Sequence, residues 1–157
     1  MQKITPYLWF DTQAEEAAQF YVSIFADSRI VNITRYGEAG PGPDGSVMTV
    51  EFELQGQRFV GLNGGPHFKF TEAVSFSVEC TTQAEIDRFS ARLSEGGEQG
   101  PCGWVKDKYG MSWQVNPTIL GEMLNDPDPG KSQRVMRSML GMTKIDIAGL
   151  QQAYDGR

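Results

Sequence analysis

The sequence predicts an α+β fold in which two similar modules, each a strand followed by a helix and further strands, form one domain with a helical tail. Apolar residues first alternate with period two and then recur at helical spacing, and this order of patterns occurs twice. The two stretches also align at an offset of 70 residues, as an internal repeat would. We therefore expect modules at residues 1–66 and 71–117 and a helical tail at 118–157, within a single domain over residues 1–157.

The first module begins with alternation over residues 4–10, which predicts a strand with Ile4 on its apolar side. Asp11 or Thr12 is the expected cap of a helix that runs to about Asp27. The apolar face of that helix comprises Ala14, Ala17, Ala18, Tyr21, Ile24 and Phe25. Strands are predicted at residues 30–36, 47–54 and 58–62, with a Gly- and Pro-rich loop at 37–45.

The second module repeats this order after the Gly64-Gly65-Pro66 break. Val74, Phe76 and Val78 alternate as a strand and are expected to pack beneath a helix capped by Thr81 or Thr82. The apolar stripe of that helix is Ile86, Phe89 and Leu93, and Gly96-Gly97 ends it. Two further strands are predicted at residues 104–106 and 112–115, on either side of an Asp107-Lys108-Tyr109-Gly110 turn.

The tail reads as a short helix around Leu120 and Leu124 followed by two more helices. Lys131, Arg134 and Arg137 recur every three residues in the second of these helices, and we interpret them as a solvated helix face. Methionines at helical spacing indicate packing, here against a second subunit.

Composition excludes several classes of function. The chain has 157 residues, of which 39% are hydrophobic, as expected for one globular domain. The net charge of -6 disfavours nucleic acid and anionic membranes as partners. No apolar stretch approaches the ~20 residues of a membrane helix or forms a secretion signal, so we expect a cytoplasmic protein with reduced cysteines.

The inventory of soft metal ligands is short: Cys80, Cys102 and His67. A closed zinc site needs four such ligands and is excluded. We interpret His67 as a loop residue rather than a catalyst. Cys102 is either an ordinary loop cysteine or, beside Lys106 and Lys108, a thiol of lowered pKa.

The loop Gly40-Pro41-Gly42-Pro43-Asp44-Gly45 matches the glycine spacing of dinucleotide-binding loops. In those proteins the glycines open a helix whose N-terminus holds the phosphates. Here a period-two strand follows instead, so we predict a flexible hairpin connection and no nucleotide site.

Five motifs in order resemble PhnB-like proteins of the glyoxalase/bleomycin-resistance (vicinal oxygen chelate) superfamily. They are Tyr7-Leu8-Trp9-Phe10, Phe20-Tyr21 with Ile24-Phe25, Gly61 to Phe70, Asp107 to Gln114, and Lys144 to Ile147. The resemblance implies paired βαβββ modules that form a cupped mixed sheet over a cavity, and a homodimer. It also carries the label demethylubiquinone 3-methyltransferase-like, which implies S-adenosylmethionine binding.

Superfamily enzymes hold a divalent metal through His, Glu or Gln on strands of both modules. The resemblance places Ala73 and Gln114 at ligand positions of the second module, and the repeat places Lys3 and Gly61 at those of the first. Of these, only Gln114 can bind a metal, and a slip of two residues adds Thr5, Ser75 and Asn63 but no histidine. We therefore predict no cofactor, with Gln114 as the one candidate metal ligand.

Polar and aromatic residues alternate with the core positions and must face the other side of the sheets. We interpret this face as a small-molecule pocket or, alternatively, as a solvent face or dimer seam. Glu51 is the candidate general base because Glu53 lies ~7 Å away on the same strand face; the alternative is an exposed acidic pair. The predicted ligand-binding residues are Tyr7, Trp9, Glu51, Asn63, Ser75, Trp104 and Gln114.

Three functions follow as hypotheses. The first is a small-molecule-binding protein without the usual metal centre, either catalytic or not. The second is a metal-dependent enzyme of the glyoxalase, dioxygenase or thiol-transferase kind. The third is the methyltransferase that the family label suggests.

Overall fold

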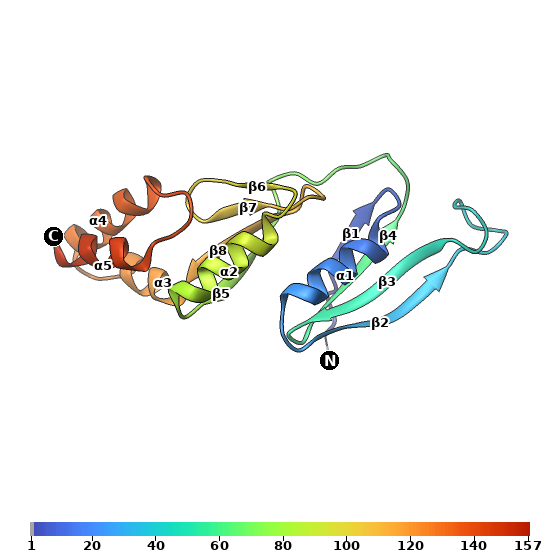
Figure 1. Ribbon diagram of the computed structural model, residues 1–157, viewed down its shortest axis with the longest axis horizontal. Coiled ribbons are helices and arrows are strands. Elements are labelled where there is room, and N and C mark those ends of the chain that lie inside the picture. The colour runs from blue at the N-terminus through green and yellow to red at the C-terminus, as the bar shows by residue number, and fades with distance from the viewer. Residues whose placement is uncertain (1) are drawn as a thin grey trace. The chain divides into compact units, whose positions relative to one another are not determined.

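The computed structural model describes residues 2–157 (Figure 1). The chain divides into two compact units, Met1–Phe70 and Thr71–Arg157, with a mixed four-stranded sheet in each. The strands come in the same spatial order in both sheets, which confirms the α+β fold of two repeated strand–helix–strands modules. No helix within residues 2–157 combines the length and the apolar character needed to cross a bilayer.

The first unit places one helix on one face of its sheet (Figure 1). Strand β1 is parallel to β4, and the β2–β3 and β3–β4 pairs are antiparallel, so the sheet order is β1-β4-β3-β2. Its elements are β1 (Tyr7–Phe10), α1 (Ala14–Ile24), β2 (Ser28–Arg35), β3 (Val47–Leu54) and β4 (Gln57–Asn63).

The second unit repeats this plan and adds the helical tail. Its sheet order is β5-β8-β7-β6, with β5 parallel to β8. Its first elements are β5 (Ser75–Cys80), α2 (Gln83–Leu93), β6 (Glu98–Gln99), β7 (Trp104–Lys106) and β8 (Ser112–Pro117). The tail consists of α3 (Thr118–Leu124), α4 (Pro129–Leu140) and α5 (Ile147–Asp155).

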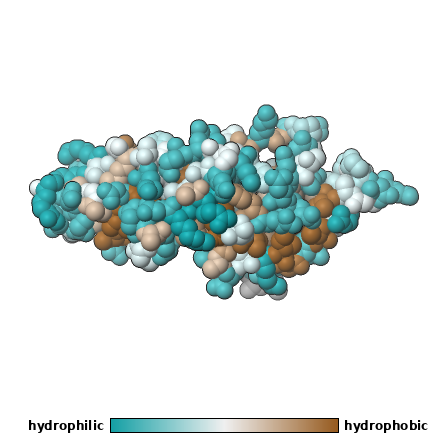
Figure 2. Space-filling view, viewed as in Figure 1, coloured by the Kyte–Doolittle hydropathy of each residue, from teal (hydrophilic) through white to brown (hydrophobic). Residues whose placement is uncertain are grey.

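The core of the first unit lies between α1 and the sheet. The small residues of α1, Ala14, Ala17 and Ala18, are buried as predicted. A Cβ on Gly61 would approach the Cβ of Ala14 to 3.1 Å, so glycine lets the helix come close to β4. Figure 2 shows hydrophobic surface over α1 and β2 on the viewed face of this unit.

Several expected boundaries are wrong. Ile4 is 87% exposed and precedes β1, which begins only at Tyr7. Val74 is 60% exposed and precedes β5, so it does not pack beneath α2. In both cases the alternation of the sequence begins before the first residue that pairs with a neighbouring strand. Strand β6 was missed because two residues are too few to show a period.

The two module helices begin differently. Thr82 caps α2 as predicted, since its side chain accepts a hydrogen bond from the N–H of Glu85 at 3.2 Å. The first residue outside α1 is Gln13 rather than Asp11 or Thr12, and its side chain makes no cap hydrogen bond. The acceptor at this helix end comes from another element, as described below.

The Gly-rich loop is folded around a single ring. Tyr36 is buried, and its hydroxyl donates a hydrogen bond of 2.6 Å to the carbonyl of Asn63. A side chain at Gly40 or Gly42 would collide with the Tyr36 ring. The loop connects β2 to β3 as predicted, and its glycines allow this packing rather than the approach of a phosphate.

The last two helices of the tail, α4 and α5, are attached to each other by side-chain contacts. Arg134 donates from Nε and Nη2 to the carbonyls of Ala153 and Tyr154, at 2.8 and 2.9 Å, and so caps the C-terminal end of α5. Lys131 lies 4.9 Å from the Tyr154 ring centre. The expectation of a wholly solvated basic face is therefore wrong, since only Arg137 of the three basic residues is exposed.

Candidate functional site

The first sheet carries an aromatic and acidic face on the side away from α1. Tyr7 pairs with Val60 across β1–β4, and Val60 pairs with Glu51 across β4–β3. Residues in one such row share a face of the sheet, and Trp9 follows Tyr7 at period two. The structure thus brings Tyr7, Trp9 and Glu51 to one face, where Tyr7 is 63% exposed.

Trp9 is held in place by the loop that follows β4. Its indole N–H donates to the carbonyl of Gly65 at 2.9 Å. The ring also meets Phe68 edge-on, with 4.8 Å between ring centres. The indole is therefore fixed on the sheet face.

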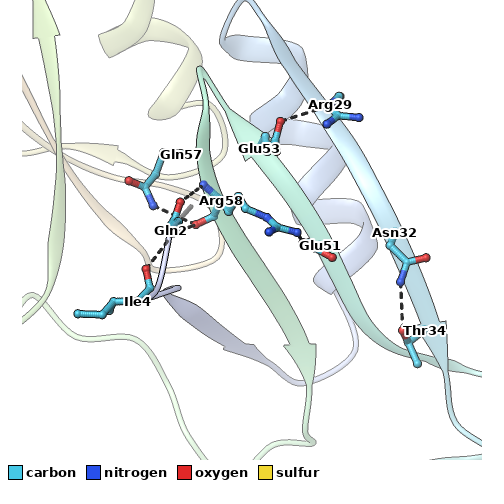
Figure 3. A network of polar contacts seen from close by, with 9 residues as sticks. All are labelled: Gln2, Ile4, Arg29, Asn32, Thr34, Glu51, Glu53, Gln57 and Arg58. Carbon is cyan, nitrogen blue, oxygen red and sulfur yellow. Dashed lines mark hydrogen bonds and ion pairs between the residues drawn. The ribbon is translucent and has the colours of Figure 1, made fainter.

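Each glutamate of β3 has its own arginine (Figure 3). Arg58 of β4 forms an ion pair with Glu51, and Arg29 of β2 forms one with Glu53 at 3.2 Å. Each carboxylate therefore lies beside a positive charge. The arrangement favours charge balance across the sheet over the coupled acidic pair that was one interpretation of the sequence.

Asn63 acts mainly on the fold of the first unit. Its Oδ1 accepts a hydrogen bond of 2.8 Å from the N–H of Ala14, the first residue of α1, and its Nδ2 donates to the carbonyl of Val47 at 3.1 Å. Both ends of the amide are engaged. The cap that the sequence was expected to supply locally comes from β4, 49 residues away in sequence.

The second sheet brings together three of the predicted residues, Ser75, Trp104 and Gln114. Ser77, Gln114 and Trp104 lie in one row across β5, β8 and β7. Gln114 donates from Nε2 to the Ser75 hydroxyl at 2.9 Å. This face therefore presents an indole beside an oriented amide.

Trp104 and Gln114 also line a cavity of about 370 Å³ at the end of the sheet where α3 begins. Helix α3 and Met139 of α4 form its other side. The complete lining is Glu79, Cys102, Trp104, Gln114, Asn116, Pro117, Thr118, Leu120, Gly121, Leu124 and Met139. Trp104 and the tail helices thus border a partly open space of small-molecule size.

Two other cavities hold charged residues. One of about 380 Å³ lies beside β6 and β7, where Lys106 forms ion pairs with Glu72 and, at 3.8 Å, Glu98. The hydrogen bond from Lys106 lowers the pKa of Glu72 and raises that of Lys106. The other, of about 640 Å³, lies in the first unit near the start of α1 and is lined in part by Glu15 and His67.

The residues at the expected metal positions do not fit a divalent ion. Ala73 and Lys3 lie outside the strands, and Gly61 faces α1. The strand register shows which residue of the first module is equivalent to Gln114. Tyr7 of β1 corresponds to Ser77 of β5, and these residues pair with Val60 and Gln114. Val60, rather than Gly61, is therefore equivalent to Gln114. Within residues 2–157 no three His, Cys, Asp or Glu side chains are grouped so that they could hold a metal.

The Asp107 motif has a structural role that sequence reasoning missed. Asp107 is 2% exposed, and its carboxylate accepts hydrogen bonds from the N–H groups of Tyr109 and Met111 and from the Trp113 indole, at 2.9, 3.0 and 2.9 Å. A buried carboxylate with this many donors fixes the β7–β8 turn. The spacing of an Asp six residues before a Trp was the signal that could have revealed it.

Comparisons with known proteins agree with this fold. The family model for 3-demethylubiquinone-9 3-methyltransferase matches residues 2–116. A Bacillus cereus PhnB protein, described as a 3-demethylubiquinone-9 3-methyltransferase, is 42% identical over 74% of this chain and 100% of its own, with a TM-score of 0.66. No curated protein shows significant similarity.

Protein PA1353 is a more distant structure that shares the fold. Protein PA1353 from Pseudomonas aeruginosa is 22% identical over 74% of this chain and 98% of its own, with a TM-score of 0.60. A glyoxylase/bleomycin resistance protein/dioxygenase domain from Frankia is 18% identical over 74% and 92%, with a TM-score of 0.47. On the family match and the 42% identity, the chain belongs to the PhnB-like, 3-demethylubiquinone-9 3-methyltransferase family.

Proposed function

We propose that this chain is a small-molecule-binding protein that holds its ligand with side chains of the sheet faces and without the superfamily's metal centre. The observation that carries the proposal is the second sheet, where Trp104 and Gln114 stand directly opposite each other and line a cavity. A planar aromatic wall next to an amide is typical of small-ligand sites, because the ring supplies contact area and the amide supplies direction.

The polar residues there are arranged for binding more than for acid–base chemistry. Gln114 is oriented by its hydrogen bond to Ser75, which leaves its carbonyl oxygen on the same sheet face. Within the first unit, taken by itself, we propose that Tyr7, Trp9 and Glu51 form a ligand-contacting face. The ion pair of Glu51 with Arg58 supports a binding role over that of a general base.

A nuclear magnetic resonance screen of small neutral and charged fragments tests the proposal. Ligands should shift the Trp104 indole N–H and the Gln114 side-chain amide. Gln114→Ala should weaken a hit by roughly fivefold, the value of one lost hydrogen bond. Gln152→Ala, an exposed glutamine of α5, is the matched control and should change nothing. Equal affinity in Gln114→Ala would reject the site.

The family description favours a methyltransferase as the second candidate. Such an enzyme would need a site for S-adenosylmethionine, and the one glycine-spaced loop of the chain is folded around Tyr36. We therefore expect no heat of binding when S-adenosylmethionine is titrated into the protein. Binding at micromolar concentration would favour the methyltransferase over the binding protein.

A further inference from the structure

The cavity beside Trp104 is walled by a part of the chain that the family model does not include. The match to that model ends at residue 116, whereas Leu120, Gly121 and Leu124 of α3 and Met139 of α4 line the cavity opposite the sheet. The helical tail therefore adds an apolar wall to the sheet face that the proposed function uses.

This wall is held in place by specific hydrogen bonds. The N–H groups of Cys102 and Gly103, just before β7, donate to the carbonyls of Met142 and Thr143 at 2.8 and 2.7 Å. The Gln83 side chain of α2 donates to the carbonyl of Ile145 at 3.0 Å and accepts from the N–H of Ile147 at 2.8 Å. The cavity is thus formed before any ligand arrives, which lowers the entropic cost of binding.

The charge of the lining selects a class of ligand. Among the described residues that line the cavity, Glu79 carries the only charge. Glu79 lies opposite Asn116 across β5–β8, on the sheet face that lines the cavity. The Glu79 carboxylate accepts hydrogen bonds and is negatively charged, so the site favours a donor and a positive charge and repels an anion.

We propose that the cavity takes a small aromatic amine, with its ring between Trp104 and the apolar side chains of the tail and its ammonium group toward Glu79. The inference rests on the proposed function, because it names the ligand class for the same Trp104–Gln114 face. The indole face of Trp104 also suits a ligand cation.

Three probes with one ring and different charges test the class: tryptamine, indole and indole-3-acetate. We expect tryptamine to bind the full-length protein at least about tenfold more tightly than indole-3-acetate, with indole between them. Glu79→Gln should reduce the tryptamine preference to about twofold or less. Glu122→Gln removes an exposed charge of α3 that does not line the cavity, and it should keep the preference.

A cavity-filling variant tests the part played by the tail. A Cβ at Gly121 meets no atom within 4 Å and Gly121 lines the cavity, so we expect Gly121→Leu to extend its side chain into this space. It should lower tryptamine affinity at least about tenfold while the protein stays folded, because the added side chain occupies the site. Gly141→Leu, at the end of α4 and away from the cavity, is the control for adding a leucine to the tail.

The outcomes separate the two proposals. If other fragments shift Trp104 and Gln114 while tryptamine does not bind or Gly121→Leu binds it normally, the aromatic-amine inference is wrong and the proposed function stands. If tryptamine and every other fragment leave both residues unshifted, both proposals are wrong. Tighter binding of indole-3-acetate than of tryptamine would also overturn the inference.

Discussion

At the scale of the residue, the buried Asp107 carboxylate stabilises the second unit by accepting three hydrogen bonds. Asp107→Asn keeps the shape of the side chain but turns one carboxylate oxygen into a donor that faces other N–H donors. We expect a loss of about 2–3 kcal/mol in the free energy of unfolding, measured by urea denaturation. Asp44→Asn, in the exposed Gly-rich loop, should leave stability unchanged, and an equal loss in both variants would contradict the assignment.

The two cysteines should differ in reactivity. Burial, followed by the charges of Glu85 and Glu79, raises the pKa of Cys80 to about 11. Cys102 is only half-buried. We expect a disulfide reagent such as 5,5′-dithiobis(2-nitrobenzoic acid) to label one thiol per folded chain, at Cys102, and the second only in denaturant. A Cys102→Ser variant that still reacts rapidly when folded would contradict this.

The raised pKa of Cys80 also gives a stability that depends on pH. The folded-state value of about 11 lies above the unfolded value of 9.0, so the neutral buried thiol stabilises the fold fully below pH 9. This contribution disappears as the pH rises through 11. The difference in Tm between the native protein and Cys80→Ala should therefore be largest below pH 9 and shrink toward pH 11. A difference that stays constant with pH would contradict the raised pKa of Cys80.

At the scale of the element, the start of α1 depends on Asn63 rather than on its own flanking residues. Asn63→Ala removes the acceptor for the Ala14 N–H and the donor to Val47. We expect it to cost about 1–2 kcal/mol of stability in denaturant unfolding. Gln13→Ala, at the local cap position, should cost almost nothing, and the reverse order of the two variants would contradict the long-range cap.

The elements were predictable from sequence to the extent that their signals are local. The helix stripes at Ala14 to Ile24 and at Ile86 to Leu93, and the strand alternation, emerge from period alone. Asn63 and Arg58 could not be placed because their partners lie on other strands or at a distant helix end. The register between β1 and β4 could not be predicted either, because it is known only once the strands are paired. This register makes Val60, rather than Gly61, the equivalent of Gln114.

At the scale of the whole molecule, the chain combines the repeated fold of its family with a tail that the family model does not cover. The fold could be predicted because its residue pattern occurs twice and because its motifs resemble a known family. The cavity could not, since it depends on where the tail helices pack. We propose that the chain forms a homodimer in the cytoplasm, in line with the expectation from sequence.

The central claim is that side chains, and not a divalent ion, hold the ligand. Native mass spectrometry of the full chain, with and without zinc, nickel or manganese, measures subunit number and bound mass together. We predict a dimer that takes up no stoichiometric ion, because Val60 and the Ser75-bound Gln114 do not form a ligand set. One ion per chain, lost in Gln114→Ala, would contradict the account.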